Sequence, residues 1–438
     1  MAALSVSGEV RVPGDKSISH RALMLASLAT GQSRVRGLLE SADVHSTANV
    51  LRALGAPIAA LGAELRIRGG GLQGLRAPSA PLDCGNSGTT TRLMAGVCAG
   101  HRFESIFVGD ASLSRRPMRR VARPLEAMGA EVLLEGDGLP MIVRGGALHA
   151  VEWQNEKSSA QVKSAVLLAA LVGGVEATVV EPEASRDHSE RMLRALGVDV
   201  RSAGGSVTIR PATALRPLDI EVPGDPSSAA FFAALAVLAS SGELRMPNVG
   251  LNPTRTGFFH ALRRMGADVR FEDERDAGGE PVGTIVARAS GRSLRSTTAG
   301  GAEIPTMIDE LPLLACVAAR ADGTTVITNA AELRVKESDR IATVVANLRA
   351  LGVEARELPD GLSVTGSDKP LRGRAVTHGD HRMAMAFGVL GAIPGNEVTV
   401  DDPDCAIVSF PGFWELLAAI TGERRVSEPR HGAGSAAP

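Results

Sequence analysis

The sequence predicts a protein of the α/β class, in the broader sense that includes α+β, with six mixed helix–strand repeats divided between two domains. Three observations support this prediction: a recurring helix-ending motif, two Pro-Gly-Asp breaks, and a composition that suits a large aliphatic core. Hydrophobic residues make up 44% of the 438 residues and charged residues 22%, which is usual for globular proteins. Aromatic residues make up only 3% and tyrosine is absent, so Ala, Val, Leu, Ile and Met must fill the core.

The helix-ending motif has two apolar residues three positions apart, followed by glycine. Its copies are LRALGA at 51–56, LEAMGA at 125–130, LRALGV at 193–198, LRRMGA at 262–267, LRALGV at 348–353 and a degenerate LAAITG at 417–422. The apolar pair predicts a buried helix face, and the glycine predicts a left-handed residue that ends the helix. Strand-like stretches often follow, such as EVLL at 131–134. Recurrence about every 70 residues indicates a repeat rather than unrelated helix endings.

Two turn signals divide the six repeats into three plus three. Pro-Gly-Asp occurs at 13–15 and again at 223–225, and such tripeptides mark turns. We expect hinges at both, so that one domain spans 15–224 and the other spans 1–14 plus 225–423. The first strand, at 4–12, then belongs with the second domain. The tail at 424–438 is rich in Gly, Ser, Ala, Pro and charge, and we expect it to be disordered.

Composition also argues against several classes of function. A net charge of −2 gives no electrostatic footprint for nucleic acid. The four cysteines lie far apart without CxxC spacing, which favours reduced cytoplasmic thiols over disulfides or a zinc site. No signal peptide is evident, and the apolar run at 231–239 is too short to span a bilayer. We therefore expect a cytoplasmic monomer that binds neither nucleic acid nor a membrane.

Polar or basic loops precede predicted helices at many places in both halves. They are PGDKSISHR at 13–21, DCGNSGTTTR at 83–92, GDASLSRRP at 109–117, SSAQVKS at 158–164, SRDHSE at 185–190, IPTMIDELP at 304–312, LRVKESDRI at 333–341 and HGDHRMAM at 378–385. Helix N-termini attract anions, and guanidinium groups suit carboxylate and phosphate. We predict a cleft between the domains that collects small anions. Taken singly, each loop also fits an ordinary capped surface helix.

Some of these residues permit two interpretations. In the first loop, Ser17 or Ser19 is the expected N-cap. Asp309 lies in an apolar stretch, so its pKa could be raised and it could act as a base, or it could simply complement a helix dipole. Lys336, Asp339 and Arg340 are spaced to share a helical face, which also fits a surface helix with internal ion pairs. His378 and His381 have no third ligand nearby, so we expect no metal.

Seven segments, in this order, resemble the signatures of the EPSP synthase family (3-phosphoshikimate 1-carboxyvinyltransferases). They are PGDKSISHR, GNSGTTTR, SRRP, SSAQVKSAVLL, IPTMIDELP, RVKESDR and GDHRMAM, within residues 5–420. The resemblance implies a two-domain inside-out fold with three βαβαββ units per domain. It also implies attack of the 5-hydroxyl of shikimate 3-phosphate on C2 of phosphoenolpyruvate, protonation of C3 and loss of phosphate. No metal or organic cofactor is expected.

The resemblance also implies roles for individual residues. Lys16 would contact both substrates, Gln161 would lie between them, and Asp309 would be the acid/base partner of the 5-hydroxyl. The residues expected to bind shikimate 3-phosphate are Ser17, Arg21, Ser159, Ala160 and Lys336. Those expected to bind phosphoenolpyruvate are Gly88, through its backbone, Arg116, Arg340 and Arg382. Further candidates are Asn86, Arg186, Glu337 and His381, with Glu337 as a possible proton donor to C3.

The sequence departs from the family pattern near its C-terminus. Many members carry a lysine shortly before a Phe-Pro pair, but Val408 and Ser409 precede Phe410 here, so one phosphoenolpyruvate contact is absent or replaced. Together with SAQVKS and MIDELP, this places the chain nearer the divergent second class. Glyphosate-insensitive members of that class usually carry Ala where this chain has Gly88, so we expect sensitivity to be retained.

Two alternatives remain at this point. The sister enzyme that transfers enolpyruvate to UDP-N-acetylglucosamine has the same fold, but it usually carries a reactive cysteine in the loop that corresponds to 109–117, where this chain has none. A non-catalytic repeat scaffold is also compatible with the six repeats, although Lys16, Asp309 and Lys336 argue against it.

Overall fold

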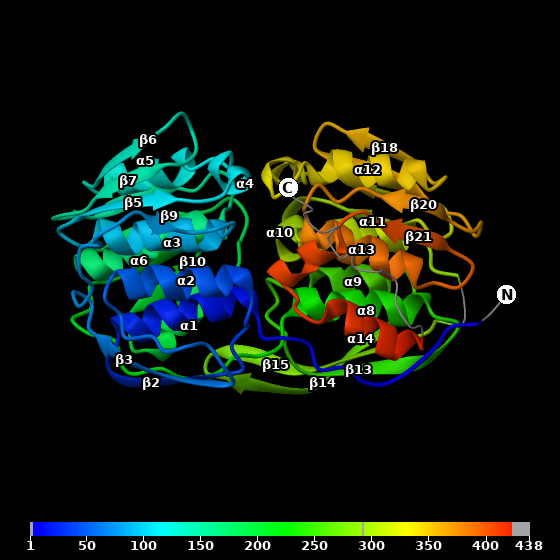
Figure 1. The fold of residues 1–438 in the computed structure, drawn as a ribbon, viewed down its shortest axis with the longest axis horizontal. Helices are drawn as coiled ribbons and strands as arrows, with labels where there is room; N and C mark the ends of the chain where they lie inside the picture. Colours follow the sequence, from blue (N-terminus) through cyan, green and yellow to red (C-terminus); the bar gives the residue numbers. More distant parts are fainter. Residues whose placement is uncertain (1–2, 291–292, 423–438) are drawn as a thin grey trace, which may run out of the picture.

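The computed structural model describes residues 3–290 and 293–422 and shows two lobes side by side (Figure 1). Each lobe has its own hydrophobic core. One core is built from residues between Ile18 and Val222, and we call this part the N-lobe. The other combines Leu4, Val6 and Val10 with residues from Ala229 to Leu417, and we call it the C-lobe. The predicted tail at 424–438 lies outside the described residues.

Six sheets form the outer layers, three in each lobe. The N-lobe strands are β2 (Thr30–Arg36), β3 (Glu64–Gly70), β4 (Leu82–Asp83), β5 (Glu104–Val108), β6 (Glu131–Leu134), β7 (Met141–Arg144), β8 (Val151–Gln154), β9 (Ala177–Val180), β10 (Val200–Ala203), β11 (Ser206–Ile209) and β12 (Asp219–Glu221). They form the sheets β12-β2-β3, β4-β5-β7-β6 and β8-β9-β11-β10. In the last two sheets, the first pair is parallel and the others are antiparallel.

The C-lobe repeats the same scheme. Its strands are β1 (Ser5–Glu9), β13 (Ser241–Gly250), β14 (Asp268–Ala277), β15 (Glu280–Arg288), β16 (Thr298–Ala299), β17 (Thr324–Ile327), β18 (Glu354–Leu358), β19 (Gly361–Thr365), β20 (Arg372–Ala375) and β21 (Glu397–Val400). They form the sheets β1-β13-β15-β14, β16-β17-β19-β18 and β20-β21. Each again opens with a parallel pair. The mixed α/β fold predicted from the sequence is confirmed.

Two of the six units differ from the complete βαβαββ pattern expected from the resemblance. The first N-lobe sheet has three strands rather than four, because Pro57 and Gly62 interrupt the segment that would form the missing strand, and both residues disfavour strands. The last C-lobe sheet has only two strands. There the chain continues into a 3-10 helix, η3 (Pro403–Val408), and α14 (Phe413–Thr421) instead of a hairpin.

The two lobes exchange their entry strands. β1 pairs with β13 of the C-lobe, and the chain then enters the N-lobe. β12 pairs with β2 of the N-lobe, and the chain then enters the C-lobe. The two segments cross where Asp15 N–H donates to Pro223 O (2.7 Å) and Asp225 N–H donates to Pro13 O (2.9 Å). Gly14 is required at this crossing because a Cβ there would overlap the carbonyl oxygen of Gly37.

Three buried helices form the interior of each lobe. They are α1 (Lys16–Leu28), α3 (Gly88–Ala99) and α6 (Ala160–Gly173) in the N-lobe, and α8 (Pro226–Leu238), α11 (Leu311–Ala318) and α13 (His381–Gly391) in the C-lobe. We call these six the central helices. They are buried on nearly all sides, and the most apolar of them show this clearly: in α8, every residue from Pro226 to Val237 is buried. A helix that is apolar all round is stable only when it is enclosed, so the sheets lie outside and the helices inside.

The remaining helices connect the sheets. They are α2 (Ala42–Ala53), α4 (Ala111–Ser114), α5 (Arg119–Ala127), α7 (His188–Ala195), α9 (Gly257–Arg264), α10 (Ile304–Met307) and α12 (Arg340–Ala350), with the 3-10 helices η1 (Gly301–Glu303) and η2 (Ala331–Val335). The glycines of the six predicted helix-ending motifs all have φ between +72° and +103°, which confirms the predicted left-handed conformation. Within 3–290 and 293–422, no helix has both the length and the hydropathy needed to cross a bilayer.

Candidate active site

A cavity of about 420 Å³ lies between the lobes, and all six central helices begin at it. The lining residues at or just before their N-terminal ends are Lys16, Ser17, Gly88, Ala160, Asp225, Asp309, His381 and Arg382. Each helix start contributes unpaired N–H groups and the positive end of its dipole, which favour bound anions. A cavity with residues from both lobes in its walls is therefore present between the lobes, and its occupation by small anions stays a prediction.

Almost all of the predicted site residues line this cavity. They are Lys16, Ser17, Gly88, Arg116, Ser159, Ala160, Gln161, Arg186, Asp309, Lys336, Glu337, Arg340, His381 and Arg382. The two exceptions, Arg21 and Asn86, lie outside the lining and form hydrogen bonds to residues that line the cavity. Arg21 donates from Nη1 to the carbonyl oxygen of Ser17 (2.9 Å). Asn86 accepts from Arg116 Nη2 (2.5 Å). These two residues can therefore act through their neighbours rather than by direct contact with a ligand.

Side-chain caps fix the starts of most central helices. Asp15 caps α1 by accepting from Ile18 N–H (2.8 Å), whereas the sequence favoured Ser17 or Ser19. That expectation was wrong because α1 begins at Lys16, so Ser17 already lies in its first turn. Ser159 caps α6 in the same manner. Because the N-cap side chain accepts the hydrogen bond from the helix start, the side chains of the first turn keep their own polar groups free for the cavity.

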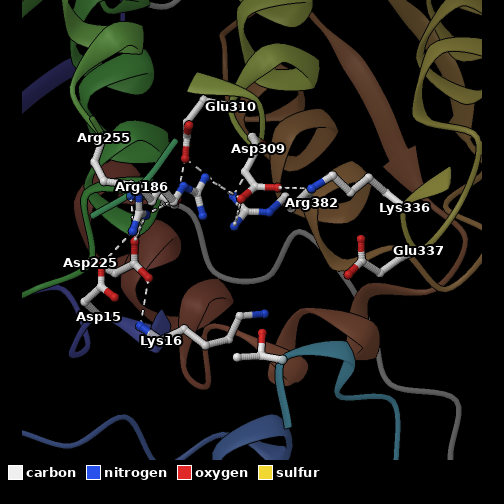
Figure 2. A network of polar contacts seen from close by, with 12 residues as sticks. Asp15, Lys16, Arg186, Asp225, Arg255, Asp309, Glu310, Lys336, Glu337 and Arg382 are labelled. Carbon is white, nitrogen blue, oxygen red and sulfur yellow. Dashed lines mark hydrogen bonds and ion pairs between the residues drawn. The ribbon is translucent and has the colours of Figure 1, made fainter. Parts of the chain in front are cut away.

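Asp309 lies among four cations, of which Figure 2 labels Arg186, Lys336 and Arg382. The distances from its carboxylate oxygens are 2.6 Å to Arg186 Nη2, 3.1 Å to Arg340 Nη1, 3.7 Å to Lys336 Nζ and 3.7 Å to Arg382 Nη2. Burial raises the pKa of Asp309, but these cations outweigh burial and hold the pKa well below its usual range. The raised pKa expected from the sequence is wrong, because neighbours that are apolar along the chain are not its neighbours in space.

Glu337 is a second ionised carboxylate in the cavity. Its Oε1 lies 3.3 Å from Arg116 Nη1 and its Oε2 lies 2.7 Å from Arg340 Nη2. Burial raises the pKa of Glu337, but Arg340, Arg116 and other nearby cationic groups hold it well below its usual range. Burial, together with the charge of Lys16, lowers the pKa of His381 to about 3. Its imidazole is therefore neutral at physiological pH and is available as a hydrogen-bonding group.

Lys336, Asp339 and Arg340 do not share one helical face as expected. Lys336 follows η2, Asp339 caps α12 by accepting from Ala342 N–H (3.0 Å), and Arg340 is the first residue of α12. The helix begins only at Arg340 because Asp339 takes the extended backbone conformation of an N-cap. Lys336 and Arg340 nevertheless both reach Asp309.

Ion pairs join the lobes at the cavity, in addition to the pair of Arg255 with Asp15 at the crossing of the two segments. Basic side chains of the N-lobe meet acidic side chains of the C-lobe in Arg116–Glu337 (3.3 Å), Arg120–Glu332 (2.6 Å) and Arg186–Asp309 (2.6 Å). An anion that binds Arg116 or Arg186 would have to compete with Glu337 or Asp309 for the guanidinium group. Binding of an anion at either arginine would therefore break an ion pair between the lobes.

Sequence reasoning missed several cavity residues. Arg92 donates to Gln161 Oε1 (2.6 Å), and burial lowers its pKa to about 10. Asp43 pairs with Lys16 Nζ (3.0 Å). Arg255 binds both Asp15 and Asp225 (2.9 Å each) at the crossing of the two segments (Figure 2). Arg92 ends the GNSGTTTR motif and could have been chosen, whereas Asp43 and Arg255 lie in segments without any local signal.

Metal-binding and thiol chemistry have little support in the described residues. Within 3–290 and 293–422, no group of three or more His, Cys, Asp and Glu side chains could hold a metal ion. The four cysteines are free, and burial raises the pKa of Cys84 and Cys98 to about 12. In the C-terminal segment that departs from the family pattern, Phe410 packs in the C-lobe core. The described residues that line the cavity include none from 408–411.

Comparison with known proteins gives a consistent result. Residues 2–417 match the family model of EPSP synthase (3-phosphoshikimate 1-carboxyvinyltransferase). The chain is 47% identical over 422 residues to the 3-phosphoshikimate 1-carboxyvinyltransferase of Sulfurihydrogenibium sp. (strain YO3AOP1), covering 95% of this chain and 97% of that protein. It is 48% identical to that of Xanthomonas oryzae pv. oryzae (strain PXO99A), covering 95% of each. The solved EPSP synthase of Acinetobacter baumannii superposes with a TM-score of 0.85 at 40% identity, covering 96% of this chain and 97% of that one.

Proposed function

The chain belongs to the EPSP synthase family, and from this premise we propose how its residues carry out the reaction. The enzyme transfers the enolpyruvyl group of phosphoenolpyruvate to the 5-hydroxyl of shikimate 3-phosphate and releases phosphate, a step of aromatic amino acid biosynthesis. The relatives support this acceptor and not the UDP-N-acetylglucosamine alternative. The observation that carries the residue assignments is the convergence of six helix N-termini and a set of cations on one cavity.

The substrates divide the cavity between them. We assign shikimate 3-phosphate to the side formed by Ser17, Ser159, Ala160, Arg186 and Lys336, and phosphoenolpyruvate to the side formed by Gly88, Arg116, Arg340 and Arg382. Lys16 and Gln161 lie between the two. Gln161 is held by Arg92 (2.6 Å) and by Thr89 Oγ1 (3.0 Å), which supports a fixed amide at the border. Several cations are needed because two anions must be brought together against their mutual repulsion.

Exchange of ion pairs prepares both carboxylates for proton transfer. When shikimate 3-phosphate binds Arg186 and Lys336, its negative charge offsets part of the positive charge that lowers the pKa of Asp309. The pKa of Asp309 then rises, and its carboxylate becomes a stronger base for the 5-hydroxyl proton. When phosphoenolpyruvate binds Arg116 and Arg340, Glu337 likewise gains proton affinity, takes up a proton from solvent and delivers it to C3. The two carboxylates also stabilise the cation that develops at C2. The 5-oxygen bonds to C2 and gives a tetrahedral intermediate. Asp309 then returns its proton to the departing phosphate, the bond between C2 and the phosphate oxygen breaks, and C3 gives a proton back to Glu337, which restores the double bond between C2 and C3.

A phosphate-release assay with purified protein tests this function. We expect release that requires both phosphoenolpyruvate and shikimate 3-phosphate, and none when UDP-N-acetylglucosamine replaces the latter. Release with the sugar nucleotide would favour the sister enzyme, and no release with either acceptor would favour a non-catalytic scaffold.

We also propose that the crossing segments are hinges between a domain of residues 15–224 and a domain of residues 1–14 plus 225–423, and that the enzyme is a cytoplasmic monomer. The separate hydrophobic cores of the lobes support the domain assignment. Light scattering during gel filtration tests the oligomeric state, with an expected mass near the 45.3 kDa of one chain. A mass of twice this value would show a dimer.

Glyphosate sensitivity is a further part of the proposal. A Cβ at Gly88 would lie 3.0 Å from Arg92 Nη1 and 3.4 Å from Arg116 Nη1, so glycine leaves room for an anion beside both guanidinium groups. We therefore propose that glyphosate competes with phosphoenolpyruvate here. A measured inhibition constant settles the point, and resistance of the unmodified enzyme would contradict it.

A further inference from the structure

Lys163 is a fully buried lysine beneath the cavity, and the reaction leaves it without a role. It lies in the first turns of α6, the helix whose N-terminal residues Ala160 and Gln161 line the cavity. Its side chain is only 2% exposed. A lysine is almost never fully buried unless it is paired. The partners of Lys163 therefore indicate what it holds in place.

Lys163 joins the two ends of one connecting segment. Its Nζ lies 2.8 Å from Glu181 Oε2 and 2.8 Å from Glu190 Oε1. Glu181 immediately follows β9, and Glu190 lies in the first turn of α7. The segment between them carries Ser185 and Arg186 into the cavity wall. One buried ammonium group thus fixes both ends of the loop that presents these two side chains.

Glu181 extends this contact to a second loop. Ser185 Oγ donates to its carboxylate (2.8 and 2.9 Å), and Asn155 Nδ2 donates to Oε1 (2.7 Å). Asn155 also donates to the carbonyl oxygen of Ser159 (3.0 Å), the N-cap of α6. Because β8 and β9 are parallel neighbours, their carboxyl ends meet at one edge of the sheet. Glu181 therefore links the loop of Ser159 with the loop of Ser185.

The cluster is close to electrical balance. Glu181 and Glu190 are opposed by Lys163 and by Arg21, which the charge of Glu190 stabilises. Burial lowers the pKa of Lys163, but Glu190 and Glu181 outweigh burial and raise it, so the lysine stays charged. Apart from the ion-pair contact with Lys163, Glu190 has no hydrogen-bond partner among the described residues. Loss of the lysine would leave two buried carboxylates without adequate compensation.

We propose that Lys163 and Glu181 are positioning residues for shikimate 3-phosphate. They act through Ser159, Ser185 and Arg186, whose hydroxyl and guanidinium groups suit a phosphate, and they do not touch the substrate. The proposal rests on the assignment of this side of the cavity to shikimate 3-phosphate. It differs from a purely structural role, because a structural ion pair would affect stability without favouring one substrate over the other.

Binding measurements on three variants test the proposal. Lys163→Met removes the charge at similar volume, Glu181→Gln keeps an acceptor for Ser185 and Asn155, and the double variant carries both changes. Calorimetric titration with shikimate 3-phosphate should show a dissociation constant raised roughly 10- to 100-fold in Lys163→Met, about the value of one charge-assisted hydrogen bond. The double variant should recover much of this loss, because one carboxylate charge is removed together with the lysine.

Two controls separate positioning from stability. The first control is Leu167→Ala, because Leu167 is fully buried and lies one turn after Lys163 in α6. It should lower the melting temperature and leave the dissociation constant within about twofold. In steady-state assays, the KM for phosphoenolpyruvate should change by less than about threefold in Lys163→Met, because the polar partners of Lys163 among the described residues include none that is assigned to phosphoenolpyruvate. Equal increases in both KM values would overturn the proposal.

Arg186→Ala distinguishes failure of the proposal from failure of its premise. If Arg186→Ala weakens shikimate 3-phosphate binding but folded Lys163→Met and Glu181→Gln bind normally, the positioning role is wrong. If Arg186→Ala also binds normally, the assignment of this side of the cavity is wrong, and the positioning role is lost with it. Should Lys163→Met fail to fold, Glu181→Gln alone decides, with a severalfold increase expected in the dissociation constant.

Discussion

Replacement of Asp309 by asparagine removes one negative charge from a cage of four cations while it keeps the size of the side chain. The nearest cation, Arg186 Nη2, lies 2.6 Å away and the others lie within 3.7 Å. An amide cannot accept the 5-hydroxyl proton, so turnover should fall by roughly 10²- to 10⁴-fold, or about 3–5 kcal/mol of activation free energy. The cause is loss of the base rather than loss of the fold.

The affinity for shikimate 3-phosphate should increase in the Asp309→Asn variant, although turnover falls. The Asp309→Asn variant leaves one uncompensated positive charge in the cavity, and an ion pair at about 4 Å contributes about 4 kcal/mol at an effective dielectric constant near 20, before desolvation. If about a third of this survives desolvation, shikimate 3-phosphate binds about tenfold more tightly. Titration calorimetry gives the affinity, and phosphate release at saturating substrates gives the turnover.

Glu310→Gln is the matched control for this experiment. Glu310 follows Asp309 in the chain and is more deeply buried; it binds Ser227, pairs with Arg382 (3.7 Å) and does not itself line the cavity. Its turnover should stay within about tenfold of the unmodified enzyme. Near-normal turnover in Asp309→Asn would remove Asp309 from the mechanism. A folded variant that binds neither substrate would show that the carboxylate serves binding instead.

Three further perturbations have defined outcomes. Burial lowers the pKa of His20 and of His381, so as pH falls below about 6.5 these histidines take up protons in the unfolded chain before they do so in the folded protein. The free energy of unfolding measured in urea should therefore drop by about 3 kcal/mol between pH 7.5 and 5.5. Equal free energies of unfolding at both pH values would contradict this. Arg120→Gln breaks the mostly buried pair with Glu332 and should raise both KM values by at most about fivefold. High salt should raise the KM values of the unmodified enzyme by a similar factor, and a larger, salt-independent increase in Arg120→Gln would mean that Arg120 contacts substrate. Gly88→Ala crowds Arg92 and Arg116 and should raise the KM for phosphoenolpyruvate several-fold with little change for shikimate 3-phosphate; the reverse pattern would exchange the two sides of the cavity.

The repeat architecture could be predicted because its signal is local. Each helix ends at a glycine whose left-handed conformation is set by the adjacent residues, and all six adopt it. The two crossings were visible as Pro-Gly-Asp turns. The incomplete first and last sheets were not predicted, because a missing strand depends on pairing partners that lie elsewhere in the chain.

Residues that line the cavity could be predicted where a helix start carries its own chemical signal, as at Lys16, Gly88 and Arg382. They could not be predicted where partners meet from distant segments. Arg255 reaches Asp15 across 240 positions in the sequence. The prediction of a raised pKa for Asp309 was wrong for the same reason, because the four cations around it come from three separate segments.

A crystal structure of the slow Asp309→Asn variant with both substrates bound tests the central claim most directly. We expect shikimate 3-phosphate against Ser159, Arg186 and Lys336, and the phosphoenolpyruvate carboxylate and phosphate against Arg116, Arg340 and Arg382, with C2 close to the 5-oxygen. The pairs of Arg116 with Glu337 and of Arg186 with residue 309 should then be replaced by substrate contacts. Either substrate bound outside this cavity, or both bound with these arginines still directed at the opposite lobe, would contradict the proposed mechanism.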